Sequence, residues 1–174
     1  MRIGTQSRFL SHNEKTLAIS VFGPSLPHWN RIRVDDGLGL GNRCYTLDAP
    51  PGYYMIHIGP IGYPDCTSKR FIPHQGPTNT VFIHEMTHVW QYAKGDNVKL
   101  SSLWAQATED DAYKYVVGDA WNDYNSEQQG DIVKRWFAGG MSKSMPEFQY
   151  IEKVVRKRGG ANASLKLAEL NALM

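Results

Sequence analysis

The chain has 174 residues, 41% of them hydrophobic, which is enough to bury a core, and we expect one domain over residues 1–174. Its formal charge of +2 is small and dispersed and no RNA- or DNA-binding motif accompanies it, so we expect no nucleic-acid partner. The sequence contains no apolar run long enough for a membrane span and no signal-peptide core at its N-terminus, so we expect a soluble chain that the general secretory pathway does not export.

The first 75 residues have the pattern of strands. Short β-like runs, separated by glycine, proline and asparagine, lie at 16–22, 31–34, 43–47 and 53–58. We expect these runs to form a small antiparallel sheet. Cys44 and Cys66 fall in this half without a CxxC spacing, so they are poor zinc ligands, and the sequence leaves open one disulfide or two buried thiols.

Residues 79–94 have the periodicity of a helix with a buried apolar face. The apolar residues recur at helical spacing, at Phe82, Ile83, Met86, Val89 and Trp90. Good N-cap residues precede this run, and Gly95 follows it at the place of a C-terminal stop. We therefore predict a helix of about four turns.

The predicted helix carries His84-Glu85-Met86-Thr87-His88, which is the HExxH signature of a zinc peptidase. Residues four apart lie on one helical face, so both imidazoles can bind one tetrahedral Zn²⁺. Glu85 then lies beside the metal, where it can take a proton from a water whose pKa zinc has lowered to about 7. We predict His84 and His88 as metal ligands and Glu85 as the catalytic base.

A catalytic zinc needs a third protein ligand. A second helical pattern opens at Asn125 and stops at Gly139-Gly140, and Glu127 in its first turn is our best candidate. The apolar face of this helix points away from Glu127, which predicts a position at the rim of a cleft. Asp131 lies one turn later, where it could accept the free N–H of a zinc-bound imidazole.

Other third ligands are less well supported. Glu109, Asp110 and Asp111 form an acidic run that is typical of a solvated helix start. A metzincin would place a third histidine at position 94, which is lysine here, so that class is excluded.

The remaining assignments concern the C-terminus and the substrate. We predict two helices, at 146–158 and 163–173, separated by Gly159-Gly160. We nominate strand 53–58 as the edge that pairs with an extended substrate. A hydrolase also needs an oxyanion stabiliser, and the sequence offers five residues of suitable type: Tyr113, Tyr115, Tyr124, His57 and His74.

The HExxH helix followed by Glu127 and Asp131 resembles the gluzincin metallopeptidases, in which a glutamate from a downstream helix completes the site. The longer motifs at 82–91, 112–115 and 123–133 resemble bacterial zincin domains linked to type VI secretion, including metallopeptidase toxin domains fused to VgrG spike proteins. This resemblance implies one bound Zn²⁺ with Glu127 as third ligand. It also implies an α+β, zincin-like fold, in which the N-terminal sheet precedes the active-site helix, the ligand helix and C-terminal helices.

The same resemblance implies an antibacterial effector that acts on a peptide or protein substrate in the periplasm of a rival cell. Its expected partners are a secretion spike and a cognate immunity protein. The missing signal peptide agrees with injection and equally with a cytoplasmic enzyme.

Three functions remain open from the sequence. The first is a zinc peptidase, in which Glu85→Ala keeps the metal and abolishes hydrolysis. The second is a non-catalytic module stabilised by zinc, in which Glu85→Ala is silent and His84→Ala unfolds the chain. The third is a zinc hydrolase that acts on the stem peptides of peptidoglycan.

Overall fold

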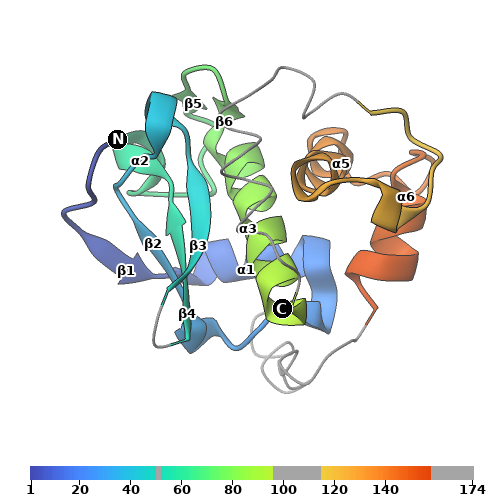
Figure 1. Cartoon of the computed structure of the whole chain (residues 1–174), viewed down its shortest axis with the longest axis horizontal. Coiled ribbons are helices and arrows are strands. Elements are labelled where there is room, and N and C mark those ends of the chain that lie inside the picture. The colour runs from blue at the N-terminus through green and yellow to red at the C-terminus, as the bar shows by residue number, and fades with distance from the viewer. Residues whose placement is uncertain (50–51, 96–114, 158–174) are drawn as a thin grey trace.

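The computed structural model describes residues 1–49, 52–95 and 115–157. Its main sheet has the order β1-β2-β4-β3, with strands β1 (Ser7–Phe9), β2 (Ile32–Asp35), β4 (Tyr53–His57) and β3 (Tyr45–Ala49) (Figure 1). β2 and β4 run parallel and the other pairs antiparallel, so the sheet is mixed and our expectation of an antiparallel sheet was wrong. The reason is that β3 and β4 form a hairpin, and the second strand of this hairpin, β4, pairs with β2. β4 runs in the same direction as β2.

Three of the four predicted strands are confirmed, each within two residues, but the run at 16–22 is not a strand. It belongs to helix α1 (His12–Phe22), which Ser11 and Glu14 start with a capping box. The buried residues of this helix include Ala18, Val21 and Phe22, spaced as one helical face. Packing of that face outweighed the strand preference of the local sequence.

The two helices predicted to form the site are confirmed. α3 spans Thr78–Lys94 and ends at Gly95, which adopts a left-handed conformation with φ 90°. α5 spans Ser126–Ala138, with a capping box between Asn125 and Gln128 at its start. The predicted helix at 146–158 appears as α6 (Phe148–Tyr150), continued by a π-helix. The predicted helix at 163–173 lies outside the described residues.

The remaining elements are short. They are the two-stranded sheet of β5 (Phe71–Ile72) and β6 (Gly76–Pro77), helix α2 (Gly59–Gly62), the 3₁₀ turns η1 (Gly23–Ser25), η2 (Trp29–Arg31), η3 (Leu40–Asn42) and η5 (Trp121–Asp123), and the π-helix η6 (Ile151–Val155).

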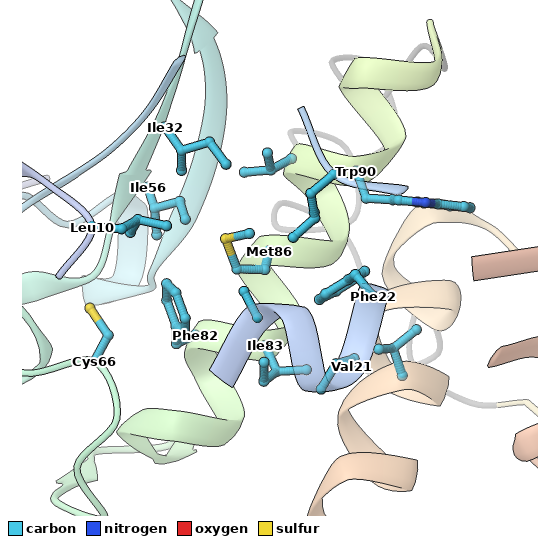
Figure 2. Packing of buried hydrophobic residues seen from close by; sticks show 14 of the residues in the cluster. Leu10, Val21, Phe22, Ile32, Ile56, Cys66, Phe82, Ile83, Met86 and Trp90 are labelled. Carbon is cyan, nitrogen blue, oxygen red and sulfur yellow. The ribbon is translucent and has the colours of Figure 1, made fainter. Parts of the chain in front are cut away.

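α3 runs between the main sheet on one side and α5 on the other (Figure 1). Ile32 and Ile56 of the sheet face Met86 of α3, while Val21 and Phe22 of α1 close the core from another side (Figure 2). Each such side chain, when fully buried, contributes about 1.5–3 kcal/mol. The helix that carries the HExxH motif is therefore anchored on several faces.

Cys44 and Cys66 are buried free thiols. Of the two alternatives that the sequence left open, the structure therefore has two buried thiols and not a disulfide. Within the described part of the chain, we find no helix with the length and apolar character needed to cross a bilayer.

Candidate metal centre

The structure brings together the three predicted ligands, from two helices that are distant in the sequence. His84 and His88 project from α3, and Glu127 projects from the first turn of α5. The Nε2 of His84 lies 3.2 Å from a carboxylate oxygen of Glu127 and 3.2 Å from the Nε2 of His88. The Nε2 of His88 lies 3.4 Å from the other oxygen of Glu127.

These spacings are close to those around a zinc ion, with the two imidazoles approaching different oxygens of Glu127. Ligand atoms bound about 2.0–2.2 Å from one tetrahedral zinc lie about 3.3–3.5 Å from one another. One ligand atom from each side chain lies within 4.8 Å of the other two, and all three residues are buried. Two histidines and a glutamate are also a ligand set that catalytic zinc uses in proteins.

Glu127 is more deeply buried than we expected. Its residue exposure is only 3%, so its predicted position at the rim of a cleft was wrong. Gly130, one turn later, explains the close approach of α5 to α3: a Cβ at this position would lie 2.8 Å from the Cε1 of His84. Because Gly130 has no side chain, the first turn of α5 can press Glu127 against both imidazoles.

The electrostatics of this cluster favour a positive charge at its centre. Burial disfavours the imidazolium of His88, but the carboxylates of Glu127 and Glu85 outweigh burial and raise the pKa of His88. Burial also opposes ionisation of Glu127, yet the charge of His88 and hydrogen bonds from both imidazoles lower the pKa of Glu127 well below its usual range. A bound cation would be stabilised by the same negative charges that stabilise the proton on His88.

Glu85, the predicted base, is held by the neighbouring edge of the sheet. The hydroxyl of Thr46, on β3, donates a 2.8 Å hydrogen bond to the Oε2 of Glu85, and both residues are buried. This contact fixes one carboxylate oxygen. The Glu85 side chain still lines the same cavity as the three candidate ligands.

Asp131, whose contact with a zinc-bound imidazole the sequence left open, makes no hydrogen bond to His84 or His88 among the described residues. The Nδ1 of His88 bonds to the Oε1 of Gln91 at 2.8 Å, and the Nδ1 of His84 has no hydrogen-bond partner among the described residues. Asp131 instead faces Lys134, with 3.8 Å between Oδ1 and Nζ. The α5 residue that faces the His84 ring is Gly130, so Asp131 is displaced to the cavity wall.

A cavity of about 520 Å³ opens above the three candidate ligands. β3 forms one wall, with Tyr45, Thr46 and Leu47, and Lys134 of α5 lies on another. The edge strand of the sheet at this cavity is therefore β3. Our nomination of strand 53–58 was wrong, because that strand lies between β2 and β3 inside the sheet.

The lining of the cavity distinguishes among the residues predicted as candidates for oxyanion stabilisation. Of the four that lie among the described residues, His74 alone lines the cavity. The hydroxyl of Tyr124 is bonded to Tyr150 and to the carbonyl of Val116. The Nδ1 of His57 lies 2.8 Å from Asp35.

The other predicted residues cannot be placed in the structure. Tyr113 and the competing acidic ligands Glu109, Asp110 and Asp111 lie outside the described residues.

Known proteins match this chain in both sequence and structure. It is 38% identical over 136 residues to the type VI secretion system spike protein VgrG2b of Pseudomonas aeruginosa, and the match covers 75% of this chain but only 13% of that protein. It also matches the solved structure of the effector domain of Pseudomonas aeruginosa VgrG2b, with a TM-score of 0.60, 31% identity and coverage of 84% of this chain and 83% of that one. The chain belongs to the family of the VgrG2b effector domain. No protein-family profile matches it.

Sequence reasoning missed several residues that shape the site of this VgrG2b-type effector domain. No sequence pattern indicated the role of Thr46, because the sequence of a strand does not show which helix its hydroxyl will contact. Gly130 did give one, since a glycine inside a predicted helix often marks a close packing contact. Gln91 lies one turn after His88, where it could have been proposed as the hydrogen-bond partner of that ring.

Proposed function

We propose that this chain is a zinc-dependent metallopeptidase that acts as a type VI secretion effector domain with a zincin-like arrangement. The observation that carries this proposal is the convergence of His84, His88 and Glu127 beneath a cavity that Glu85 also lines. Membership of the VgrG2b effector-domain family supports the assignment to type VI secretion.

His84, His88 and Glu127 would hold the metal. A zinc ion there supplies Lewis-acid chemistry, since it lowers the pKa of water to about 7 and polarises a carbonyl oxygen. Glu85 accepts the proton of the attacking water and later donates it to the leaving amine. The Thr46 hydroxyl keeps one Glu85 oxygen fixed, so the other oxygen is the one that meets the water.

The substrate would lie along β3. Among the described strands β3 pairs with β4 alone, so its outer edge can receive an extended peptide as an added strand. β3 also forms a wall of the cavity, which brings such a peptide to Glu85. A protein loop and a peptidoglycan stem peptide both offer a peptide bond for this position.

Membership of this family supports a proposal for the biological setting. The curated relative is a spike protein, and the match covers only a small part of it. We propose that this domain travels with such a spike, acts in the periplasm of the target cell and is neutralised in the producer by an immunity protein.

Expression of the domain in a susceptible Gram-negative cell tests this proposal. The wild type carrying a periplasmic export signal should stop growth, and the same domain kept in the cytoplasm should not. Glu85→Gln should abolish the toxicity of the exported form, while Glu152→Gln, at an exposed position on η6, should retain it. If Glu85→Gln is fully toxic, the domain acts as a non-catalytic binding module and the peptidase proposal is wrong.

The substrate class can be separated with purified probes. Labelled casein reports cleavage of protein chains, and isolated peptidoglycan reports cleavage of stem peptides. The proposal requires that the wild type cleaves at least one of them and that Glu85→Gln cleaves neither.

A further inference from the structure

Two glutamines link His88 to the start of α5. The Nδ1 of His88 bonds to the Oε1 of Gln91 at 2.8 Å, and the Nε2 of Gln91 donates to the Oε1 of Gln129 at 2.8 Å. The same Nε2 donates to the carbonyl of Ser126 at 3.2 Å. The Nε2 of Gln129 donates to the carbonyls of Trp121 and Tyr124, at 3.0 and 3.1 Å.

The backbone carbonyls that these glutamines contact fix the donor and acceptor of each hydrogen bond. Backbone carbonyls only accept, so the three carbonyl partners require that the NH₂ groups of Gln91 and Gln129 face them. The Oε1 of Gln129 must then accept from Gln91, and the Oε1 of Gln91 must face His88. Both amide groups use both of their N–H bonds in this arrangement, and a flip of either one would place oxygen against a carbonyl.

An acceptor at Nδ1 decides where the proton of His88 lies. The neutral ring must carry its hydrogen on Nδ1, which leaves the lone pair on Nε2, the nitrogen that faces His84 and Glu127. We propose that Gln91 and Gln129 are positioning residues that fix the metal-binding tautomer of His88. This inference rests on the proposed zinc site and adds to it two residues that touch neither the metal nor the substrate.

The two histidines are held in different ways. The Nδ1 of His84 has no hydrogen-bond partner among the described residues, and its ring is instead packed against Gly130. Among the described residues, an acceptor at Nδ1 therefore sets the tautomer of His88 and not that of His84.

The same hydrogen bonds join the ring to the helix of the third ligand. Gln91 is on α3, whereas Ser126 and Gln129 flank Glu127 in the first turn of α5. Gln91 is buried, with a residue exposure of 1%, so water competes poorly for its amide group. The orientation of His88 and the position of Glu127 therefore depend on one set of contacts.

Two substitutions at Gln91 separate this role from general packing. Gln91→Leu removes the acceptor at His88 and the two donors to α5, whereas Gln91→Glu removes the donors and keeps an acceptor. We expect Gln91→Leu to weaken zinc affinity by about 10- to 100-fold. Gln91→Glu should lose less affinity than Gln91→Leu, because it keeps the acceptor at His88 although its second carboxylate oxygen then faces the carbonyl of Ser126. Gln149→Leu makes the same chemical change at an exposed glutamine of α6 and should bind zinc as the wild type does.

Two measurements apply to each variant. Chelator competition gives the zinc affinity. Nitrogen-15 NMR of the metal-free protein, at a pH where its own titration shows the His88 ring to be neutral, gives the tautomer. The wild type and Gln91→Glu should carry hydrogen on Nδ1, and Gln91→Leu should show a mixture. Gln129→Leu, which leaves the acceptor in place but frees the Gln91 amide, should show a smaller change in the same direction and serves if Gln91→Leu does not fold.

The inference is wrong if Gln91→Leu keeps the wild-type affinity and tautomer. It is also wrong if Gln91→Leu and Gln91→Glu lose equal affinity and change the tautomer equally, because Gln91 would then only hold the helices together. A wild type that takes up no zinc would overturn the proposed function and not this inference, because the tautomer of the metal-free protein would still decide whether Gln91 sets it.

Discussion

The hydroxyl of Thr46 is the nearest support of the proposed base, and its removal should affect catalysis more than metal binding. Thr46→Val keeps the shape of the side chain and removes the donor to Glu85. Hydrogen bonds to charged groups are worth about 1.5–3 kcal/mol, so we expect kcat to fall by about tenfold or more with zinc content unchanged. Thr46→Ser, which keeps the donor, should remain close to the wild type. Equal kcat for Thr46→Val and wild type would contradict this role.

Substitution of Gly130 by alanine should destabilise the protein, which is the opposite of the usual effect of this substitution in a helix. Glycine to alanine inside a helix ordinarily stabilises a protein by about 0.5–1 kcal/mol. Here the new Cβ would lie 2.8 Å from Cε1 and 2.9 Å from Nδ1 of His84, so Gly130→Ala should instead lower both the stability of the metal-free protein and its zinc affinity.

A double-mutant cycle isolates this contact. In a His84→Ala background the ring is gone, so Gly130→Ala should there become neutral or stabilising in urea unfolding of the metal-free protein. If the substitution is equally destabilising in both backgrounds, the His84 ring is not what requires glycine.

His74 is the described oxyanion candidate that lines the cavity, and it adopts a left-handed backbone conformation with φ 62°. Residues other than glycine in such a conformation cluster at functional sites. We expect His74→Ala to lower kcat by about a hundredfold while leaving zinc affinity unchanged. His12→Ala, at an exposed position, is the control, and an equal effect of the two substitutions would exclude His74 from the chemistry.

At the scale of elements, the buried carboxylate of Glu14 joins three segments. It receives two 2.7 Å hydrogen bonds from Arg8 on β1, one from the backbone of Ser11 at the start of α1, and one from the backbone N–H of Cys66. Burial alone would raise the pKa of Glu14, but these hydrogen bonds outweigh it and lower the pKa to about 2.

This shift makes stability depend on pH in a defined window. The folded pKa lies below the ordinary value of 4.5, so the contribution is complete above about pH 4.5 and is lost as the pH falls toward 2. The full shift corresponds to about 3 kcal/mol of unfolding free energy. Urea unfolding at a series of pH values should show a steeper acid loss for the wild type than for Glu14→Gln, with Glu152→Gln as the exposed control. Parallel pH profiles for wild type and Glu14→Gln would refute this account.

The elements also show what sequence could and could not predict. α3 and α5 were predictable because periodicity, caps and glycine stops agreed with one another. α1 was missed although Ser11 and Glu14 form a capping box that is readable in the sequence, because the run at 16–22 after it contains β-branched and aromatic residues that strands also favour. The mixed sheet was missed because the direction of β4 depends on which neighbour it joins, and local patterns do not contain that choice.

At the scale of the whole molecule, the site arises from the packing of α3 between the sheet and α5. The HExxH spacing and Glu127 were accessible from sequence, because ligand chemistry restricts residue types. The contacts of Thr46 and Gln129 were not, since each depends on how two distant elements meet. Gly130 signalled a close contact, but the sequence did not show that the His84 ring is its partner. Most of the supporting contacts thus come from tertiary structure, whereas the reactive groups come from local motifs.

The most direct test of the zinc peptidase is metal content and casein or peptidoglycan hydrolysis of the wild type beside Glu85→Gln and Glu127→Gln. The account predicts one zinc per chain and hydrolysis in the wild type, one zinc without hydrolysis in Glu85→Gln, and loss of both in Glu127→Gln. A folded wild-type protein that takes up no zinc when it is supplied, or a Glu85→Gln variant that hydrolyses as fast as the wild type, would contradict it.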